Sequence, residues 1–213
     1  MNIRFSQREL KDLLVAWLAL GVAFAIFLNR DLLTQLLGGQ SPDVGAIVTA
    51  IVLSLLTAGV GFLLHELAHK VVAIRFGQIA EFRADYNMLF LAVLGALAGF
   101  LFAAPGAVHH RGRITKRENG LIALAGPVTN VALAFVFVVP LLVALFGVSS
   151  TLVFQIGALG VSINLLLAGF NMIPFGPLDG TKVLAWNKIV YVVVAVPTVL
   201  VALLVILVGI PGL

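Results

Sequence analysis

Apolar and polar positions alternate along the chain in long blocks. Apolar blocks cover 13–28, 46–76, 88–104, 121–146, 152–170 and 189–207, and short polar segments separate them. About 20 apolar residues suffice for a helix to cross a bilayer, so most of these blocks predict transmembrane helices. The pattern predicts one membrane domain over 1–213, with transmembrane helices at 13–28 and 189–207 near its ends.

Composition supports the membrane assignment. The chain is 62% hydrophobic and 10% charged, whereas soluble domains carry about 25% charged residues. We therefore expect an all-α polytopic membrane protein with about five transmembrane helices, whose surroundings are the lipid bilayer. The net charge of +4 gathers in short segments, which favours membrane orientation over nucleic-acid binding. The absence of cysteine excludes disulfides and thiolate zinc sites.

The block at 46–76 contains the sequence His65-Glu66-Leu67-Ala68-His69. Histidines four residues apart share one face of a helix and can hold one metal ion, while Glu66 can take a proton from a water on it. A motif this short also occurs by chance. Here, however, no charged residue precedes it from Ala46 to Leu64, and ionisable groups within a membrane span indicate function.

The depth of the motif follows from helix geometry. His65 lies 19 residues after Ala46, or ~28 Å along a helix, and the hydrocarbon core is ~30 Å thick. Lys70 and Arg75 follow directly, and Arg4, Arg8 and Lys11 precede the first block. By the positive-inside rule the site is expected near the cytoplasmic face of a multi-pass cell-membrane protein.

The H-E-x-x-H spacing of this motif is that of zinc hydrolases, which need a third protein ligand. Asp179 is the best candidate among the nine acidic residues. It follows an apolar block and lies in the segment Asn171 to Gly180, whose two prolines and two glycines turn the backbone. The alternative for this segment is an ordinary surface loop. The remaining carboxylates are expected in loops, in tails or just past the second span: Glu9, Asp12, Asp31, Asp43, Glu81, Asp85 and Glu118.

Three segments, 65–69, 125–130 and 171–180, resemble in this order the three motifs of the site-2 proteases, which are intramembrane zinc metalloproteases. The resemblance covers 46 to about 185 and implies a catalytic core at 46–185, with 13–28 and 189–207 as flanking transmembrane helices. It implies one Zn²⁺ per chain, with His65, His69 and Asp179 as metal ligands. It also implies that Glu66 is the general base acting on a zinc-bound water, and that Asn171 binds substrate or stabilises the oxyanion.

The implied activity is hydrolysis of peptide bonds in transmembrane segments of membrane-protein substrates. Gly126, Pro127 and Asn130 match a structural motif of the family, and close helix packing is one explanation of this glycine. Thr181 and Lys182 stand where a second glycine and an arginine are common. Two other functions stay open: a catalytically silent membrane regulator, and a metal or proton transporter that uses the histidine pair as a relay.

The block at 88–104 is expected to be re-entrant. The HELAH motif and Asp179 must meet on one side of the membrane, and 121–146 with 152–170 already make a round trip. Met88–Phe102 therefore enters as a helix of ~22 Å, and Ala103–His110 returns as a strand of ~26 Å. The alternative is a plain transmembrane helix with the opposite topology downstream.

The returning strand suggests how a substrate binds. An unwound transmembrane substrate could pair with the free edge of Gly106-Ala107-Val108 by strand addition. The neighbouring His109 and His110 are expected at a basic surface, where they contact anionic headgroups, rather than as further zinc ligands.

Overall fold

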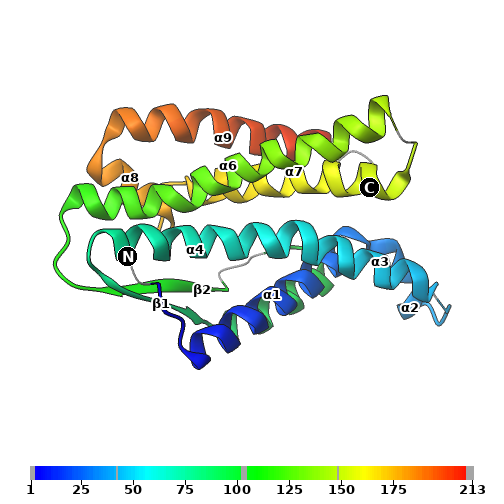
Figure 1. Cartoon of the computed structure of the whole chain (residues 1–213). Coiled ribbons are helices and arrows are strands. Elements are labelled where there is room, and N and C mark those ends of the chain that lie inside the picture. Colours follow the sequence, from blue (N-terminus) through cyan, green and yellow to red (C-terminus); the bar gives the residue numbers. More distant parts are fainter. Residues whose placement is uncertain (1–2, 42, 102–104, 148, 210–213) are drawn as a thin grey trace.

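The computed structural model describes residues 3–41, 43–101, 105–147 and 149–209. These residues form helices and one two-stranded sheet (Figure 1). In chain order the elements are α1 (Gln7–Leu28), α2 (Arg30–Leu37), α3 (Val44–Ser54), a π-helical turn η1 (Leu55–Gly59), α4 (Val60–Arg75), β1 (Ile79–Ala84), α5 (Tyr86–Ala98), β2 (Gly106–Arg111), α6 (Lys116–Phe146), α7 (Thr151–Asn171), α8 (Asp179–Trp186) and α9 (Lys188–Val208).

Among the described residues, five helical segments are long and apolar enough to cross a membrane, which confirms the predicted fold class. They are Gln7–Leu28, Val44–Arg75, Lys116–Phe146, Thr151–Asn171 and Lys188–Val208. The second segment is continuous through α3, η1 and α4. Each lies within a few residues of its predicted block, except that the first begins well before 13.

The early start of α1 corrects the prediction that Glu9 and Asp12 lie in a polar tail. Ser6 caps the helix by accepting a hydrogen bond from the Glu9 backbone N–H at 3.1 Å. Glu9 and Asp12 are buried in the first turns of α1. The sequence pattern was misleading because buried partners, rather than water, surround these carboxylates.

The π turn lies just before the histidine motif. At its end the Val60 backbone N–H donates to the Leu55 carbonyl, which also accepts from the Trp17 indole N–H at 3.1 Å. Gly59 is required here, because a Cβ at this position would lie 2.6 Å from the Trp17 ring. Such turns occur frequently at functional sites; this one fixes where α1 crosses the helix that carries the motif.

The two strands show that α5 is re-entrant. β1 and β2 pair antiparallel, from Ile79 opposite Arg111 to Ala84 opposite Gly106. The chain therefore leaves the sheet at Ala84 and returns beside it at Gly106, without net passage across the bundle. α5 ends at Ala98 rather than at the predicted Phe102, because Gly99 adopts a left-handed φ of 94°. Residues 102–104 of the predicted return lie outside the described residues.

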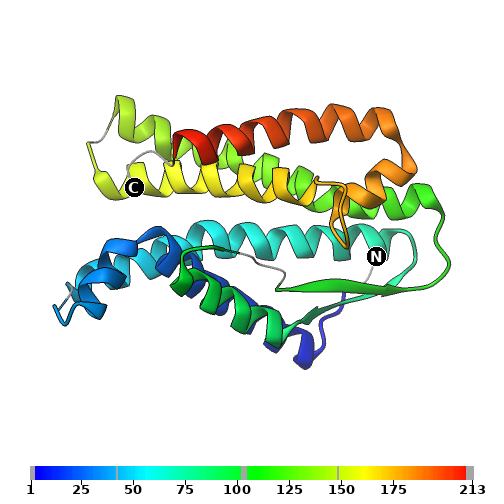
Figure 2. The ribbon, with the colours of Figure 1, turned by 180° about the vertical axis from the view of Figure 1, so that it is seen from behind.

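α4 is the central helix of the molecule. Helices α6, α7, α8 and α9 lie on one side of it, and α1, α5 and the sheet lie on the other (Figures 1 and 2). On the sheet side an apolar cluster joins α1, α4, β1 and α5 through Leu13, Ala16, Leu20, Phe62, Phe82 and Leu89. The middle position of α4 places the histidine motif between the two groups of elements.

Candidate active site

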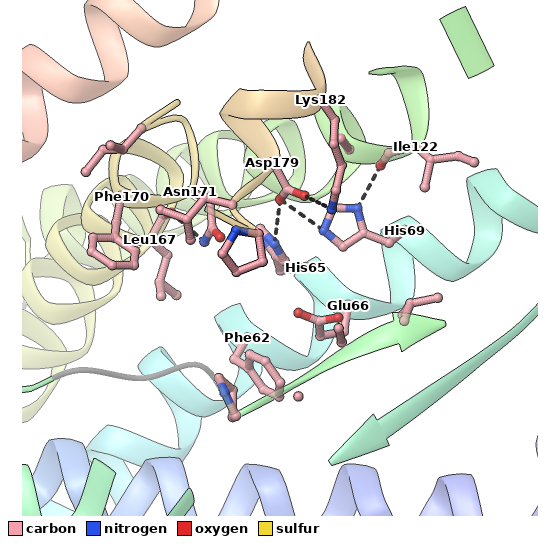
Figure 3. Close-up of a pocket in the computed structure, with 18 of the residues that line it drawn as sticks. Phe62, His65, Glu66, His69, Ile122, Leu167, Phe170, Asn171, Asp179 and Lys182 are labelled. Carbon is pink, nitrogen blue, oxygen red and sulfur yellow. Dashed lines mark hydrogen bonds and ion pairs between the residues drawn. The ribbon is translucent and has the colours of Figure 1, made fainter. Parts of the chain in front are cut away.

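The three predicted metal ligands come together, although 110 residues separate His69 from Asp179. His65 and His69 project from α4, and Asp179 is the first residue of α8 (Figure 3). The Asp179 Oδ2 atom lies 3.3 Å from Nε2 of His65 and 3.2 Å from Nε2 of His69. All three side chains are buried.

This geometry fits a zinc ion. Ligand atoms at ~2.1 Å from a tetrahedral zinc lie ~3.4 Å from one another, close to the observed separations of 3.2 and 3.3 Å. Two histidines and one carboxylate leave the fourth position of a tetrahedron open, as in catalytic rather than structural zinc sites. The donor set and its spacing therefore suit the predicted Zn²⁺.

Hydrogen bonds at the far side of each imidazole orient both rings. Nδ1 of His69 lies 2.7 Å from the Ile122 carbonyl, and Nδ1 of His65 lies 2.6 Å from Oδ1 of Asn130. A carbonyl oxygen only accepts, so both Nδ1 atoms carry the proton. The lone pairs on Nε2 are then directed to the shared centre, as in other histidine metal sites.

Asn130 holds its orientation through a buried network. Its side-chain amide donates to the Gly61 carbonyl at 3.1 Å and to Oδ1 of Asn164 at 2.9 Å. Asn164 in turn donates to the Gly160 carbonyl at 2.8 Å. With its nitrogen fixed in this way, Asn130 must present oxygen to His65. Asn130 thus supports a ligand from outside the metal shell.

The Asn130→Leu substitution is expected to weaken zinc binding by about 10- to 100-fold, because His65 loses the acceptor that fixes its tautomer. Zinc affinity measured by competition with a chromophoric chelator checks this. Thr129→Val on the same helix is the matched control, since among the described residues the Thr129 hydroxyl bonds only to the Ala125 carbonyl. Equal affinities for both variants would show that Asn130 has no role at the metal.

Gly126 on α6 faces the same centre. A Cβ at this position would lie 2.5 Å from Nε2 of His65 and 2.5 Å from Nε2 of His69. Helix packing alone, the explanation considered from the sequence, does not account for this contact. The glycine leaves open the space in front of the two atoms that would bind a metal.

The Asp179 carboxylate faces a cation as well as the two neutral histidines. Lys182, one turn later on α8, places Nζ 3.5 Å from Oδ1. The first turn of α8 also packs closely on the end of α7. A Cβ on Gly180 would lie only 2.2 Å from the Met172 carbonyl oxygen, so a larger residue does not fit there.

A cavity of about 440 Å³ opens beside the three ligands. Glu66 and Asn171 line it, together with β2 and the segment between α7 and α8 (Figure 3). Asn171 lies at the end of α7, where its side-chain amide donates to the Leu167 carbonyl at 2.9 Å. The two predicted functional residues that are not ligands therefore border the same space as the histidines.

His110 departs from the predicted surface location. His109 is exposed on β2, as expected, but His110 lines the cavity. Burial lowers the pKa of His110 below its ordinary value, and the positive charge of Lys182 acts in the same direction. Neither histidine joins a metal-binding group among the described residues. Successive side chains of a strand point to opposite faces, so the adjacent positions of His109 and His110 could have predicted that only one of them is exposed.

Comparison with known proteins agrees with this geometry. The chain is 43% identical over 198 residues to the "putative zinc metalloprotease MJ0611" of Methanocaldococcus jannaschii, covering 92% of this chain and 93% of that protein. The chain belongs to this zinc metalloprotease family. It is also 34% identical over 144 residues to the "putative zinc metalloprotease YwhC" of Bacillus subtilis, covering 61% and 66% of the two chains.

A third family member is longer. The "putative zinc metalloprotease Rip3" of Mycobacterium tuberculosis is 30% identical over 175 residues, which are 79% of this chain and 40% of that protein. No family model and no solved structure matches the chain. Membership of the zinc metalloprotease family confirms the recognition of site-2 proteases from the three motifs.

Proposed function

We propose that the protein is an intramembrane zinc endopeptidase that cleaves transmembrane segments of membrane proteins. The observation that carries this proposal is the buried His65–His69–Asp179 group within a helical membrane bundle. Glu66 follows the first ligand, and a cavity reaches the site. The names of the relatives support zinc and protease chemistry.

Each residue has a distinct task in the proposed reaction. His65, His69 and Asp179 would hold one zinc ion, which supplies Lewis acidity and lowers the pKa of a water to about 7. Glu66 accepts the proton of the attacking water and delivers it to the leaving amine. Asn171, in the cavity wall, binds the substrate backbone or donates to the developing oxyanion.

The free edge of β2 is the proposed docking site for an unwound substrate. The Phe82 N–H points away from β2, because it donates to Glu9 at 2.9 Å. Phe82 is therefore in a non-hydrogen-bonded pair with Val108, and backbone groups of Gly106, Val108 and His110 point to the opposite edge. Gly106, Val108 and His110 line the cavity, so a substrate strand added there would lie beside Glu66.

A reconstituted cleavage assay tests the proposal. The purified protein in liposomes is expected to cleave a single-span substrate and to contain about one zinc per chain, as the open three-ligand site requires. A chelator should abolish cleavage, and added zinc should restore it. Zinc uptake into the liposome lumen is measured in parallel. A chain that binds no zinc contradicts the proposal, and zinc transport without cleavage favours the transporter.

A further inference from the structure

A buried ion pair outside the proposed chemistry joins the first helix to the catalytic helix. Glu9 on α1 and Lys70 on α4 are each 1% exposed, and the Lys70 Nζ atom lies 2.5 Å from Oε2 of Glu9. A buried ion pair contributes little stability compared with apolar residues of similar size. What it does supply is a fixed geometry between the two groups that it joins.

Among the described residues, the ammonium group of Lys70 has polar and cation–π partners only in the N-terminal segment, defined here as residues 4–9. Its Nζ also donates to the Arg4 carbonyl at 2.7 Å and lies 3.9 Å from the centre of the Phe5 ring. Lys70 follows Glu66 by four residues, one turn along the same face of α4. A shift of the N-terminal segment would therefore act one helical turn from the proposed base.

The second oxygen of Glu9 holds the sheet. Oε1 accepts a hydrogen bond from the Phe82 backbone N–H of β1 at 2.9 Å. Phe82 is paired with Val108 of β2, which lines the cavity together with Glu66. Opposite members of a non-hydrogen-bonded antiparallel pair point their N–H groups to opposite edges, so the Val108 N–H points away from Glu9, to the outer edge of β2.

These contacts form a closed ring. It runs from Glu66 along one turn of α4 to Lys70, then through Glu9 and Phe82 to Val108, and the cavity that Val108 and Glu66 both line closes it. Asp12 strengthens the same attachment, since it accepts from the Tyr86 hydroxyl at 2.7 Å and from the Ala84 N–H at 3.4 Å. Glu9 and Asp12 of α1 thus hold β1 at Phe82 and at Ala84.

We propose that Glu9 and Lys70 are positioning residues that set the distance between the β2 edge and the catalytic helix. This inference rests on the proposed protease function, because it assigns the edge to substrate docking and Glu66 to proton transfer. Loss of the pair lets the sheet shift relative to α4. A displacement of about 1 Å at a reacting group can cost about 100-fold in rate.

Apolar packing also attaches the sheet, so the fold should survive loss of the pair. The Phe82 ring packs edge-on against Phe62 of α4, with 5.8 Å between centroids. The double substitution Glu9→Gln/Lys70→Met removes both charges together, which avoids an unpaired buried charge. The glutamine side-chain oxygen introduced on α1 can still accept a hydrogen bond from the Phe82 N–H, so the ring of contacts is cut only between α1 and α4.

The test combines kinetics with a distance measurement. Since the chain has no cysteine, spin labels can be placed on single cysteines at His109 of β2 and Lys188 of α9, which are both exposed. Thr115→Val/Glu118→Gln is the matched control. It removes another pair of interacting side chains, joined by the 2.9 Å hydrogen bond from the Thr115 hydroxyl to Glu118 Oε2, at the start of α6 rather than on α1 or the sheet. Zinc content and the unfolding temperature are measured for every variant.

The Glu9–Lys70 double variant is expected to keep its zinc and to show a broader label distance than the wild type. Its KM for the transmembrane substrate should rise about tenfold or more, with a smaller fall in kcat, because docking on the edge suffers first. The control pair should change neither quantity. A label distance identical to that of the wild type overturns the inference. If the wild type cleaves nothing, the proposed function fails, and the label distances still decide whether the pair positions the sheet.

Discussion

Glu66→Gln is expected to abolish cleavage while zinc binding remains at the level of the wild type. Glutamine keeps the shape of the side chain but cannot accept a proton, and removal of a general base costs about 10²- to 10⁴-fold. Glu66 is not one of the three residues whose ligand atoms converge, so the metal should stay. Single-turnover cleavage and zinc content on the same sample check both parts.

His69→Ala is the matched variant for this comparison. It removes a ligand atom 3.2 Å from Asp179 and should lose zinc and activity together. Retained cleavage in Glu66→Gln would exclude Glu66 as the base, and zinc loss in that variant would assign it to the metal shell instead.

Gly126→Ala is expected to reduce zinc affinity by about 100-fold and cleavage by a similar factor. The added Cβ would lie 2.5 Å from both Nε2 atoms, a distance that forces either the histidines or α6 to move. Zinc affinity and kcat/KM measured together check this expectation. A loss of zinc affinity, with an unfolding temperature of the zinc-free protein equal to that of the wild type, identifies the metal centre rather than helix packing as the reason for the glycine.

Gly45→Ala is the control for the glycine substitution. A Cβ at Gly45 would meet only the Asp43 carboxylate, at 3.4 Å, near the start of α3. Zinc binding should be unchanged in this variant. Unimpaired zinc binding in Gly126→Ala would show that the centre has room for a methyl group.

The residues of the candidate metal site could be predicted because short sequence patterns identify them. His65 and His69 are a fixed helical spacing apart, and Asp179 follows a proline- and glycine-rich turn in an otherwise apolar region. The re-entrant course of α5 followed from the requirement that these groups meet. The role of Gly126 could not be predicted, since nothing local distinguishes a glycine beside a metal site from one between packed helices.

The buried carboxylates of α1 were missed for a different reason. The partners of Glu9 and Asp12 lie 61 to 74 residues away, at Lys70, Phe82 and Tyr86. Strand β1 was also missed, although Ala80 and Phe82 alternate with Glu81 and Arg83. This alternation is typical of a strand with one buried face, but it is short and follows a helix that looked continuous to Phe76.

The outward backbone groups of β2 recur at every second residue, at Gly106, Val108 and His110. A peptide paired with such an edge can slide only in steps of two residues, because a step of one would exchange its two faces. The register of the paired peptide would then select the bond that is presented to Glu66. Under the proposed docking, cleavage sites produced by different registers of one substrate would lie an even number of residues apart.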